Sequence, residues 1–243
     1  MLRINSFDWF SLNRNILFDV LNSISHRIVG HELTVDQIHS KIAAQLRKHY
    51  PLIIKKSKHP KVEKGWIYVG GAYYPDKDED LEKCIEIEFA FNPNDTLLKI
   101  TPRRYLRLCT SFADTILHEV IHMRQHRRRD WRVIPSYPST AKRIKQRLEQ
   151  EYLGCRDEID AYSFNIACEL TDKFYGKKNL IIKYMNENQK GLKRRHNGYR
   201  MYLTTFGYDQ SHPVMKQLKK KVVSYLPQAA VGKPYKNSEW INY

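Results

Sequence analysis

Few features of this chain are typical of a secreted or membrane protein. It has 4 cysteines and no Cys-x-x-Cys pair, so we expect reduced, partly buried thiols rather than a disulfide framework. No apolar run approaches the roughly 20 residues needed to cross a membrane. The first residues also lack the apolar core of a secretory leader. These absences predict a cytoplasmic protein.

Sequence repeats are also lacking, and the 243 residues are enough to bury a sizeable core. We expect three regions: an N-terminal arm or helix over residues 1–30, one domain over residues 31–175, and a basic extension over residues 176–243.

The most informative segment is His118-Glu119-Val120-Ile121-His122. Apolar residues around it recur at spacings of three and four, which predicts a helix. That helix could begin at Thr101-Pro102 or at Thr110-Ser111, and we expect it to stop before Trp131. A helix places the two imidazoles one turn apart on one face with a carboxylate next to them. This arrangement is typical of a zinc site that carries its own general base, Glu119.

A catalytic zinc ion needs a third protein ligand. A histidine ten residues after His118 is excluded because that position is Arg128, and His126 lies one turn too far along the helix. Residues 156–170 predict a second helix, on which Glu158 shares a stripe with the small Ala161. We therefore predict one Zn²⁺ per chain, bound by His118, His122 and Glu158.

With these motifs the chain resembles the gluzincin metallopeptidases, in which a His-Glu-x-x-His helix is followed by a helix with a Glu-x-x-Ala motif. Among them it looks most like small zincin domains of the M48 and ImmA/IrrE types, some of which occur in phage proteins. The resemblance covers roughly residues 31–175 and rests on His118, Glu119, His122, Glu158 and Ala161. If the chain is phage-encoded, we expect it in the host cytoplasm or the virion.

The resemblance implies an orienting acid directly after Ala161, where this chain has Tyr162. Either the Tyr162 hydroxyl or another group would then orient His118. A donor for the developing oxyanion is also expected, and Tyr208 or His212 could supply it. SprT-like proteases are a related possibility because the chain is basic, but no histidine is suitably placed as their third ligand.

Three segments before the motif complete an α+β order of helix, strands and two site helices. Residues 35–50 have helical spacing, residues 66–74 could be a strand with a glycine bulge, and residues 84–91 alternate as a half-buried strand. In the resembled family, the strand just before the motif helix is an edge strand. Such an edge can pair with an extended peptide substrate. The expected fold is therefore a zincin-like α+β domain with a mainly helical basic extension.

Positive charge dominates the chain, with 42 Lys and Arg against 26 acids and a net charge of +16. Residues 177–243 alone hold 14 Lys and Arg against 3 acids, and their clusters are interleaved with aromatic residues. This composition is compatible with phosphate contacts and base stacking, but also with a solvated face or an acidic protein partner. The candidate nucleic-acid contacts are Arg127, Arg128, Arg129, Lys193, Arg194, Arg195, Lys219, Lys220 and Lys221.

The sequence as a whole predicts a zinc-dependent endopeptidase whose substrates are proteins or peptides and whose basic C-terminal region localises it. The alternative is a nucleic-acid-binding or virion-associated protein that keeps a zincin fold without proteolysis.

Overall fold

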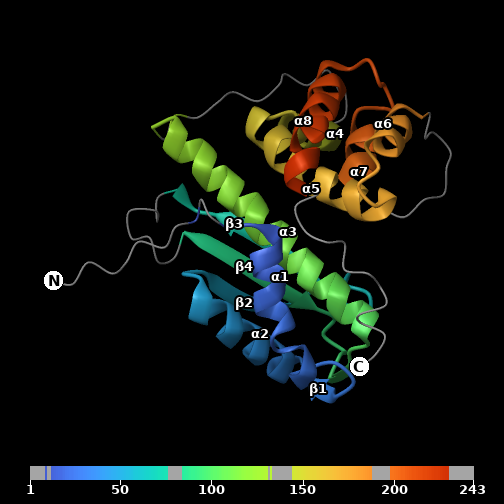
Figure 1. Cartoon of the computed structure of the whole chain (residues 1–243). Coiled ribbons are helices and arrows are strands. Elements are labelled where there is room, and N and C mark those ends of the chain that lie inside the picture. The colour runs from blue at the N-terminus through green and yellow to red at the C-terminus, as the bar shows by residue number, and fades with distance from the viewer. Residues whose placement is uncertain are drawn as a thin grey trace. The chain divides into compact units, whose positions relative to one another are not determined.

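The structure is a computed structural model that describes residues 9, 12–75, 84–130, 132, 144–187 and 198–229. Two compact units divide at Arg128 within this part of the chain. Helices and two small sheets make the protein mixed α+β, which confirms the predicted class (Figure 1). The unit boundary differs from the division expected at residue 175, and the domain assignment stays a prediction. No helix in the described ranges is long and apolar enough to span a membrane.

The first unit is built around a three-stranded sheet in the order β2-β4-β3. Strand β4 (Ile85–Phe91) pairs in parallel with β2 (Ile53–Lys58) and antiparallel with β3 (Ile67–Tyr73). The inward residues of β4 are apolar and buried, whereas Glu86 and Glu88 lie on the opposite face. A second, antiparallel pair joins β1 (Glu32–Thr34) to β5 (Leu97–Lys99). The predicted alternation of residues 84–91 is thus confirmed.

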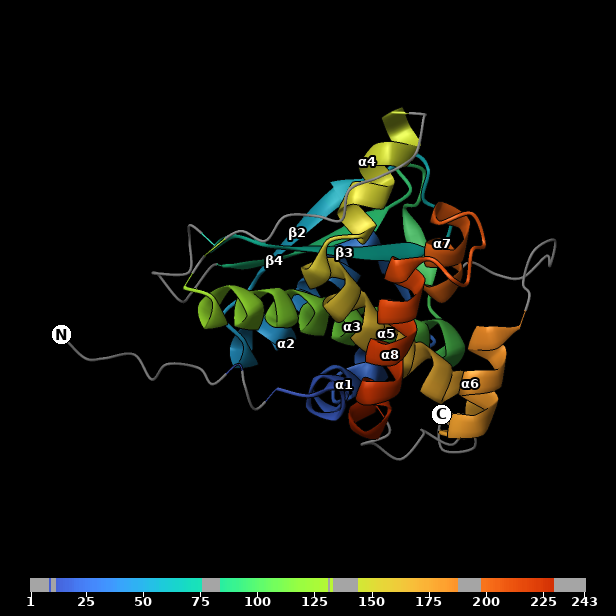
Figure 2. The ribbon, with the colours of Figure 1, turned by 90° about the horizontal axis from the view of Figure 1, so that it is seen from above.

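Helices α2 (Val35–His49) and α3 (Pro102–Arg128) cover the same face of this sheet (Figure 2). The ring of Phe89 in β4 contacts His39 of α2 and Phe112 of α3, with ring centroids 5.4 and 6.4 Å away. A capping box between Thr34 and Gln37 begins α2 by satisfying backbone N–H groups that the first turn leaves unpaired. Both helices confirm their predictions, and α3 has the longer of its two expected forms.

Helix α1 (Arg14–Asn22) and a short 3₁₀ turn (Ser25–Arg27) precede these elements. The side chain of Asn13 caps α1, and Arg14 forms an ion pair with Asp114 of α3 at 2.9 Å. The buried Tyr105 hydroxyl donates to the carbonyl of Leu21 at 2.6 Å. These contacts fix α1 against α3 in the first unit.

Two expectations about the strands are wrong. Strand β4 was expected at an edge but is central, because β2 pairs with the side that an edge strand would leave open. The edge strands of this sheet are β2 and β3. No bulge interrupts β3, since Gly70 pairs with Glu88 and Gly71 with Ile87 in a continuous register.

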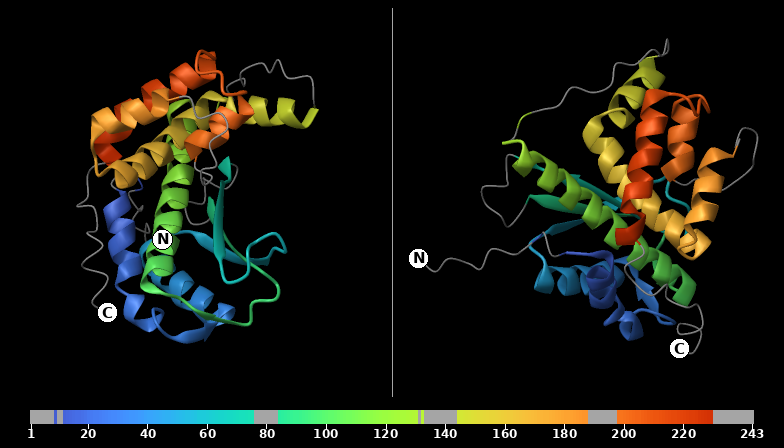
Figure 3. Two further views of the ribbon diagram at one scale, coloured as in Figure 1. Left: turned by 90° about the vertical axis from the view of Figure 1, so that its right-hand side faces the viewer. Right: turned by 45° about the horizontal axis from the view of Figure 1, so that its top comes forward.

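The second unit is helical in its described residues (Figure 3). It contains α4 (Ile144–Leu153), α5 (Arg156–Phe174), α6 (Lys178–Asn186), α7 (Gly198–Thr205) and α8 (Pro213–Ala229). Helices α5 and α8 pack side by side, and Gly198 at the start of α7 allows close contact with Ile166 of α5. One apolar core joins all five helices. Helices α6, α7 and α8 lie in the region after residue 176, which was expected to be mainly helical.

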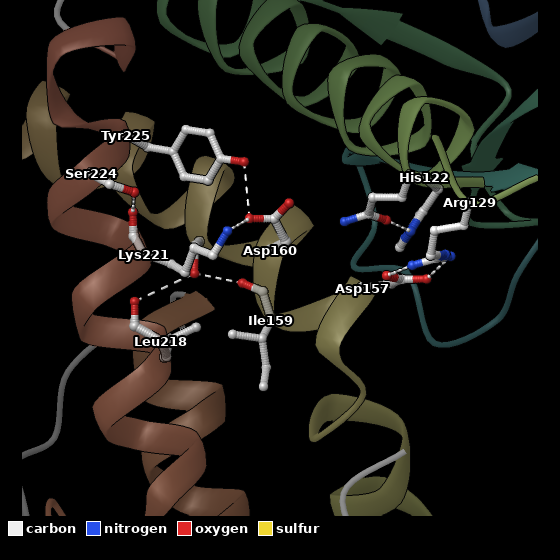
Figure 4. A network of polar contacts seen from close by, with 11 residues as sticks. His122, Arg129, Asp157, Ile159, Asp160, Leu218, Lys221, Ser224 and Tyr225 are labelled. Atoms are coloured by element: carbon white, nitrogen blue, oxygen red, sulfur yellow. Dashed lines mark hydrogen bonds and ion pairs between the residues drawn. The ribbon is translucent and has the colours of Figure 1, made fainter. Parts of the chain in front are cut away.

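Polar contacts also join α5 to α8 (Figure 4). Asp160 of α5 accepts a hydrogen bond from Tyr225 at 3.0 Å and forms an ion pair with Lys221 at 2.7 Å. Helix α8 ends at Ala229, and residues 230–243 lie outside the described residues.

Candidate metal centre

Helix α3 carries the histidine motif on its buried side. His118 and Glu119 are 8 and 6% exposed, whereas His122, one turn later, is half-buried. Burial of three polar side chains on an otherwise apolar stripe is costly unless they find partners. His118, Glu119 and His122 therefore need a bound ligand or hydrogen-bonding partners at this position.

The two imidazoles converge through the same ring atom. Nε2 of His118 lies 3.1 Å from Nε2 of His122, and the rings meet edge to face with centroids 4.8 Å apart. Two nitrogens bound to one tetrahedral zinc ion at about 2.0–2.1 Å would be about 3.3 Å apart. The pair thus has almost the spacing that a shared ion requires.

Gln125 is a partner of the site that sequence reasoning missed. Its Oε1 lies 3.0 Å from Nδ1 of His122 and can accept a hydrogen bond from it. A proton fixed on Nδ1 leaves the Nε2 lone pair free to bind a metal. The sequence could have revealed this contact, because Gln125 follows His122 by three residues and side chains at that spacing meet on a helix.

Glu119 lies against the backbone of edge strand β3. A Cβ atom added to Gly71 would lie 2.9 Å from Oε1 of Glu119 and 2.7 Å from Cγ2 of Thr115. Thr115 also donates to the carbonyl of Val69 at 3.5 Å, which ties α3 to the same strand. The glycine predicted to form a bulge instead lets the strand approach the proposed general base closely.

Glu158, in the first turn of α5, is half-buried and surrounded by tyrosines of its own unit. Burial, and then the charge of Glu158, raises the pKa values of Tyr152 and Tyr202 far above their usual range. The Tyr152 phenol is hydrogen-bonded to both Glu158 and Tyr162. The Tyr202 hydroxyl is buried and makes no hydrogen bond to the described residues.

Among the described residues, His118, His122 and Glu158 form a group that could hold a metal ion, with one potential ligand atom from each all within 4.8 Å of one another. Two imidazole nitrogens and one carboxylate oxygen suit Zn²⁺, and this donor set leaves a position for water. The residues therefore fit the predicted ion.

The other candidate ligands have different contacts. The His126 ring packs edge to face on Tyr73 with centroids 5.4 Å apart. Asp157 pairs with both nitrogens of the Arg129 fork, and Asp160 pairs with Lys221. These contacts give His126 and both aspartates structural partners in the protein.

The residues expected to support the chemistry have structural contacts in the second unit. Tyr162 hydrogen-bonds Tyr152 and packs its ring on Tyr202 with centroids 5.7 Å apart. Tyr208 has a positive φ of 61° and its amide donates to Leu203, which ends α7. His212 accepts a hydrogen bond from the Val214 amide and packs on Phe206. Their roles as orienting group or oxyanion donors stay predictions.

Several candidate nucleic-acid contacts are used within the protein. Lys219 donates to Asn186 and Gln210 at 3.2 and 3.0 Å, while Lys221 and Arg129 pair with aspartates. Arg128 and Lys220 are exposed, and Arg127 is half-buried. Lys193, Arg194 and Arg195 lie outside the described residues. Nucleic-acid binding at these positions stays a prediction.

Among the described residues of the extension, most aromatic side chains belong to the core. Tyr184, Tyr199, Tyr202 and Phe206 are at most 4% exposed and belong to the core of the second unit. Side chains buried in this way cannot offer a face to a nucleic-acid base. These four residues therefore cannot provide the base stacking that the sequence suggested for the extension.

No family model, no curated protein and no solved structure matches the chain.

Proposed function

We propose that this chain is a zinc-dependent endopeptidase of the gluzincin type. The observation that carries the proposal is the convergence of the His118 and His122 Nε2 atoms at 3.1 Å beside the buried carboxylate of Glu119. In the proposed site Glu158 is the third protein ligand, and Gln125 holds the His122 ring in the ligating tautomer.

When bound, the zinc ion would lower the pKa of a water molecule and polarise the scissile carbonyl. Glu119 would accept the proton of the attacking water and then give it to the leaving amine. Burial between α3 and the β3 backbone restricts the Glu119 carboxylate to few positions. Restricting a general base in this way lowers the entropy cost of reaching the reactive geometry.

Metal content and turnover test the proposal together. We expect one zinc per purified chain by elemental analysis, loss of zinc in Glu158→Ala, and retention of zinc in Glu119→Gln. Glu119→Gln should lower cleavage of an unfolded protein such as casein by about 10²-fold or more, because the amide cannot accept the proton.

Glu151→Ala is a matched control, since it removes a carboxylate that pairs with Arg147 on the surface of α4. It should keep both zinc and activity. Turnover by Glu119→Gln at the rate of the unmodified chain would refute the mechanism. A chain that takes up no zinc when zinc is supplied would refute the metal site.

A further inference from the structure

Helix α4 (Ile144–Leu153) exposes a row of large apolar side chains. Ile144, Leu148 and Tyr152 are 75, 58 and 52% exposed. Their spacing of four residues places them above one another on one face of the helix. We call these three residues the α4 stripe.

The opposite face of α4 holds the helix on the second unit. Leu153 is buried in the core of that unit, and the Gln150 amide donates to the carbonyl of Thr205 in α7 at 2.9 Å. The Thr205 hydroxyl donates to the Glu149 carboxylate at 3.0 Å. The α4 stripe is therefore exposed because other side chains of the same helix make its internal contacts.

Polar side chains flank the α4 stripe on both sides. The helical repeat places the exposed Lys145 on one side of it, and Arg147 and Glu151, which form an ion pair at 3.2 Å, on the other. An exposed apolar patch with a polar rim is typical of a surface that binds another molecule. The α4 stripe is thus a candidate contact surface for an apolar ligand.

The α4 stripe ends at the residue proposed as the third zinc ligand. The Tyr152 phenol is hydrogen-bonded to Glu158 within the second unit, while about half of the tyrosine side chain is exposed. A ligand that lies along α4 from Ile144 to Tyr152 therefore reaches the neighbourhood of this carboxylate.

The repeat of the α4 stripe fits an extended polypeptide. Side chains four residues apart repeat about every 6 Å along a helix. Side chains on one face of an extended chain repeat about every 6.6–6.8 Å, so alternate residues of such a chain can contact successive residues of the stripe.

A second copy of the chain fits the α4 stripe less well because the area is small. Full burial of one large aromatic side chain removes about 150–250 Å² from water, and the three side chains of the stripe are already partly covered. Each partner of a stable dimer buries about 800 Å². The stripe is therefore more suited to a short segment of polypeptide.

We infer that the α4 stripe binds alternate apolar side chains of an extended polypeptide substrate. The inference rests on the proposed peptidase, because it gives that site a preference for apolar residues to one side of the scissile bond. A contact distant from the reacting atoms is made in the ground state and the transition state alike. It should therefore act on KM rather than on kcat.

The first test measures binding without cleavage. A fluorescein-labelled peptide of alternating leucine and serine is titrated with the full-length Glu119→Gln chain, and anisotropy reports binding. Ile144→Gln and Leu148→Gln in this background should each weaken binding about fivefold, because each removes apolar contact area. The same peptide with serine in place of every leucine should bind at least about tenfold more weakly.

Leu180→Gln is the matched control, because it makes the same change at an exposed leucine of α6 in the same unit. It should leave the affinity for the peptide within about twofold. Glutamine is a good helix former and all three positions are exposed, so urea midpoints should be equal. Equal weakening by Leu148→Gln and Leu180→Gln, or equal affinity for the two peptides, would overturn the inference.

Casein cleavage by the chain with Glu119 intact separates this inference from the proposed function. Ile144→Gln and Leu148→Gln should each raise KM about fivefold and leave kcat within about twofold. An unchanged KM in both variants would overturn the inference and leave the peptidase in place. No cleavage by the unmodified chain would refute the peptidase, whereas peptide binding that depends on the α4 stripe would still support the docking surface.

Light scattering tests a second copy of the chain as the occupant. We expect the same molar mass for the unmodified chain and for Leu148→Gln. A dimer that Leu148→Gln converts to a monomer would assign the α4 stripe to self-association and overturn the inference.

Discussion

Replacement of Gly71 by alanine is a direct test of how β3 supports the proposed general base. The added methyl group would lie 2.7 Å from Cγ2 of Thr115 and 2.9 Å from Oε1 of Glu119. Both distances are far below van der Waals contact. Thr115 cannot easily move its methyl group, because a β-branched side chain on a helix has few allowed rotamers. The Glu119 carboxylate or the strand must therefore shift.

The expected magnitude follows from two opposing effects. Glycine to alanine stabilises a protein by about 0.4–1 kcal/mol where the new methyl group fits, because the unfolded chain loses freedom. Overpacking a tight contact costs about 1–3 kcal/mol. We expect Gly71→Ala to be less stable by about 1–2 kcal/mol, and to lose activity about 10²-fold if Glu119 moves by about 1 Å.

Urea unfolding measures the stability of this variant, and zinc content with casein cleavage measures its site. Gly70→Ala is the control on the same strand, since its methyl group would face the ends of the Tyr68 and Glu88 side chains at 3.2 and 3.3 Å. Those side chains can move, so stability should change by less than about 0.5 kcal/mol.

A rescue variant separates the two contacts of Gly71. Thr115→Ser removes Cγ2 and keeps the hydroxyl that donates to Val69. In the Gly71→Ala background it should restore stability while activity stays low, because the contact with Glu119 remains. If Gly71→Ala were as stable and as active as Gly70→Ala, the proposed role of this glycine would be refuted.

Three other changes test separate parts of the structure. Arg129→Leu removes the ion pair with the half-buried Asp157 carboxylate and should cost about 2–3 kcal/mol in urea unfolding, whereas adding Asp157→Leu should recover part of the loss. Burial raises the pKa of the Cys109 thiol to about 12. Iodoacetamide at pH 8 should therefore label the partly exposed Cys155 and spare Cys109 in the folded chain. Detection of labelled Cys109 by peptide mass spectrometry would contradict this. Zinc at 100 times its Kd should stabilise the chain by about 2.7 kcal/mol, so a chelator should lower the Tm of the unmodified chain and leave the Tm of Glu158→Ala unchanged. An equal fall in the two Tm values would assign the stabilisation to another site.

The sequence predicted helices α3 and α5 well because the patterns that indicate them are local. Spacings of three and four around His118 and around Glu158 report directly which side chains share a helix face. The pairing partners of a strand are not local in this sense. Alternation in β4 revealed its buried face, but its position between β2 and β3 depends on β2, whose lysines at positions 55, 56 and 58 obscure any apolar pattern.

Two other features depend on contacts between distant parts of the chain, so the sequence did not predict them: the burial of the aromatic residues after residue 177 and the contact of Gly71 with Glu119. Composition counts the aromatic residues after residue 177 but does not tell whether they are buried. Tyr199 and Tyr202 turned out to be core residues because apolar helices pack against them. Gly71 precedes Glu119 by many residues, so only the strand register and the crossing of α3 could reveal their contact.

The surroundings of Glu158 are compatible both with a structural use of its carboxylate and with its proposed use as a metal ligand. A carboxylate has two oxygens with about four acceptor positions. The Tyr152 phenol, which is protonated near neutral pH, can take one of these positions by donating a hydrogen bond to Glu158. That bond orients the carboxylate and still leaves acceptor positions for an ion. A ligand fixed in this way loses less freedom on binding, so Tyr152 contributes to the proposed site without contacting the metal.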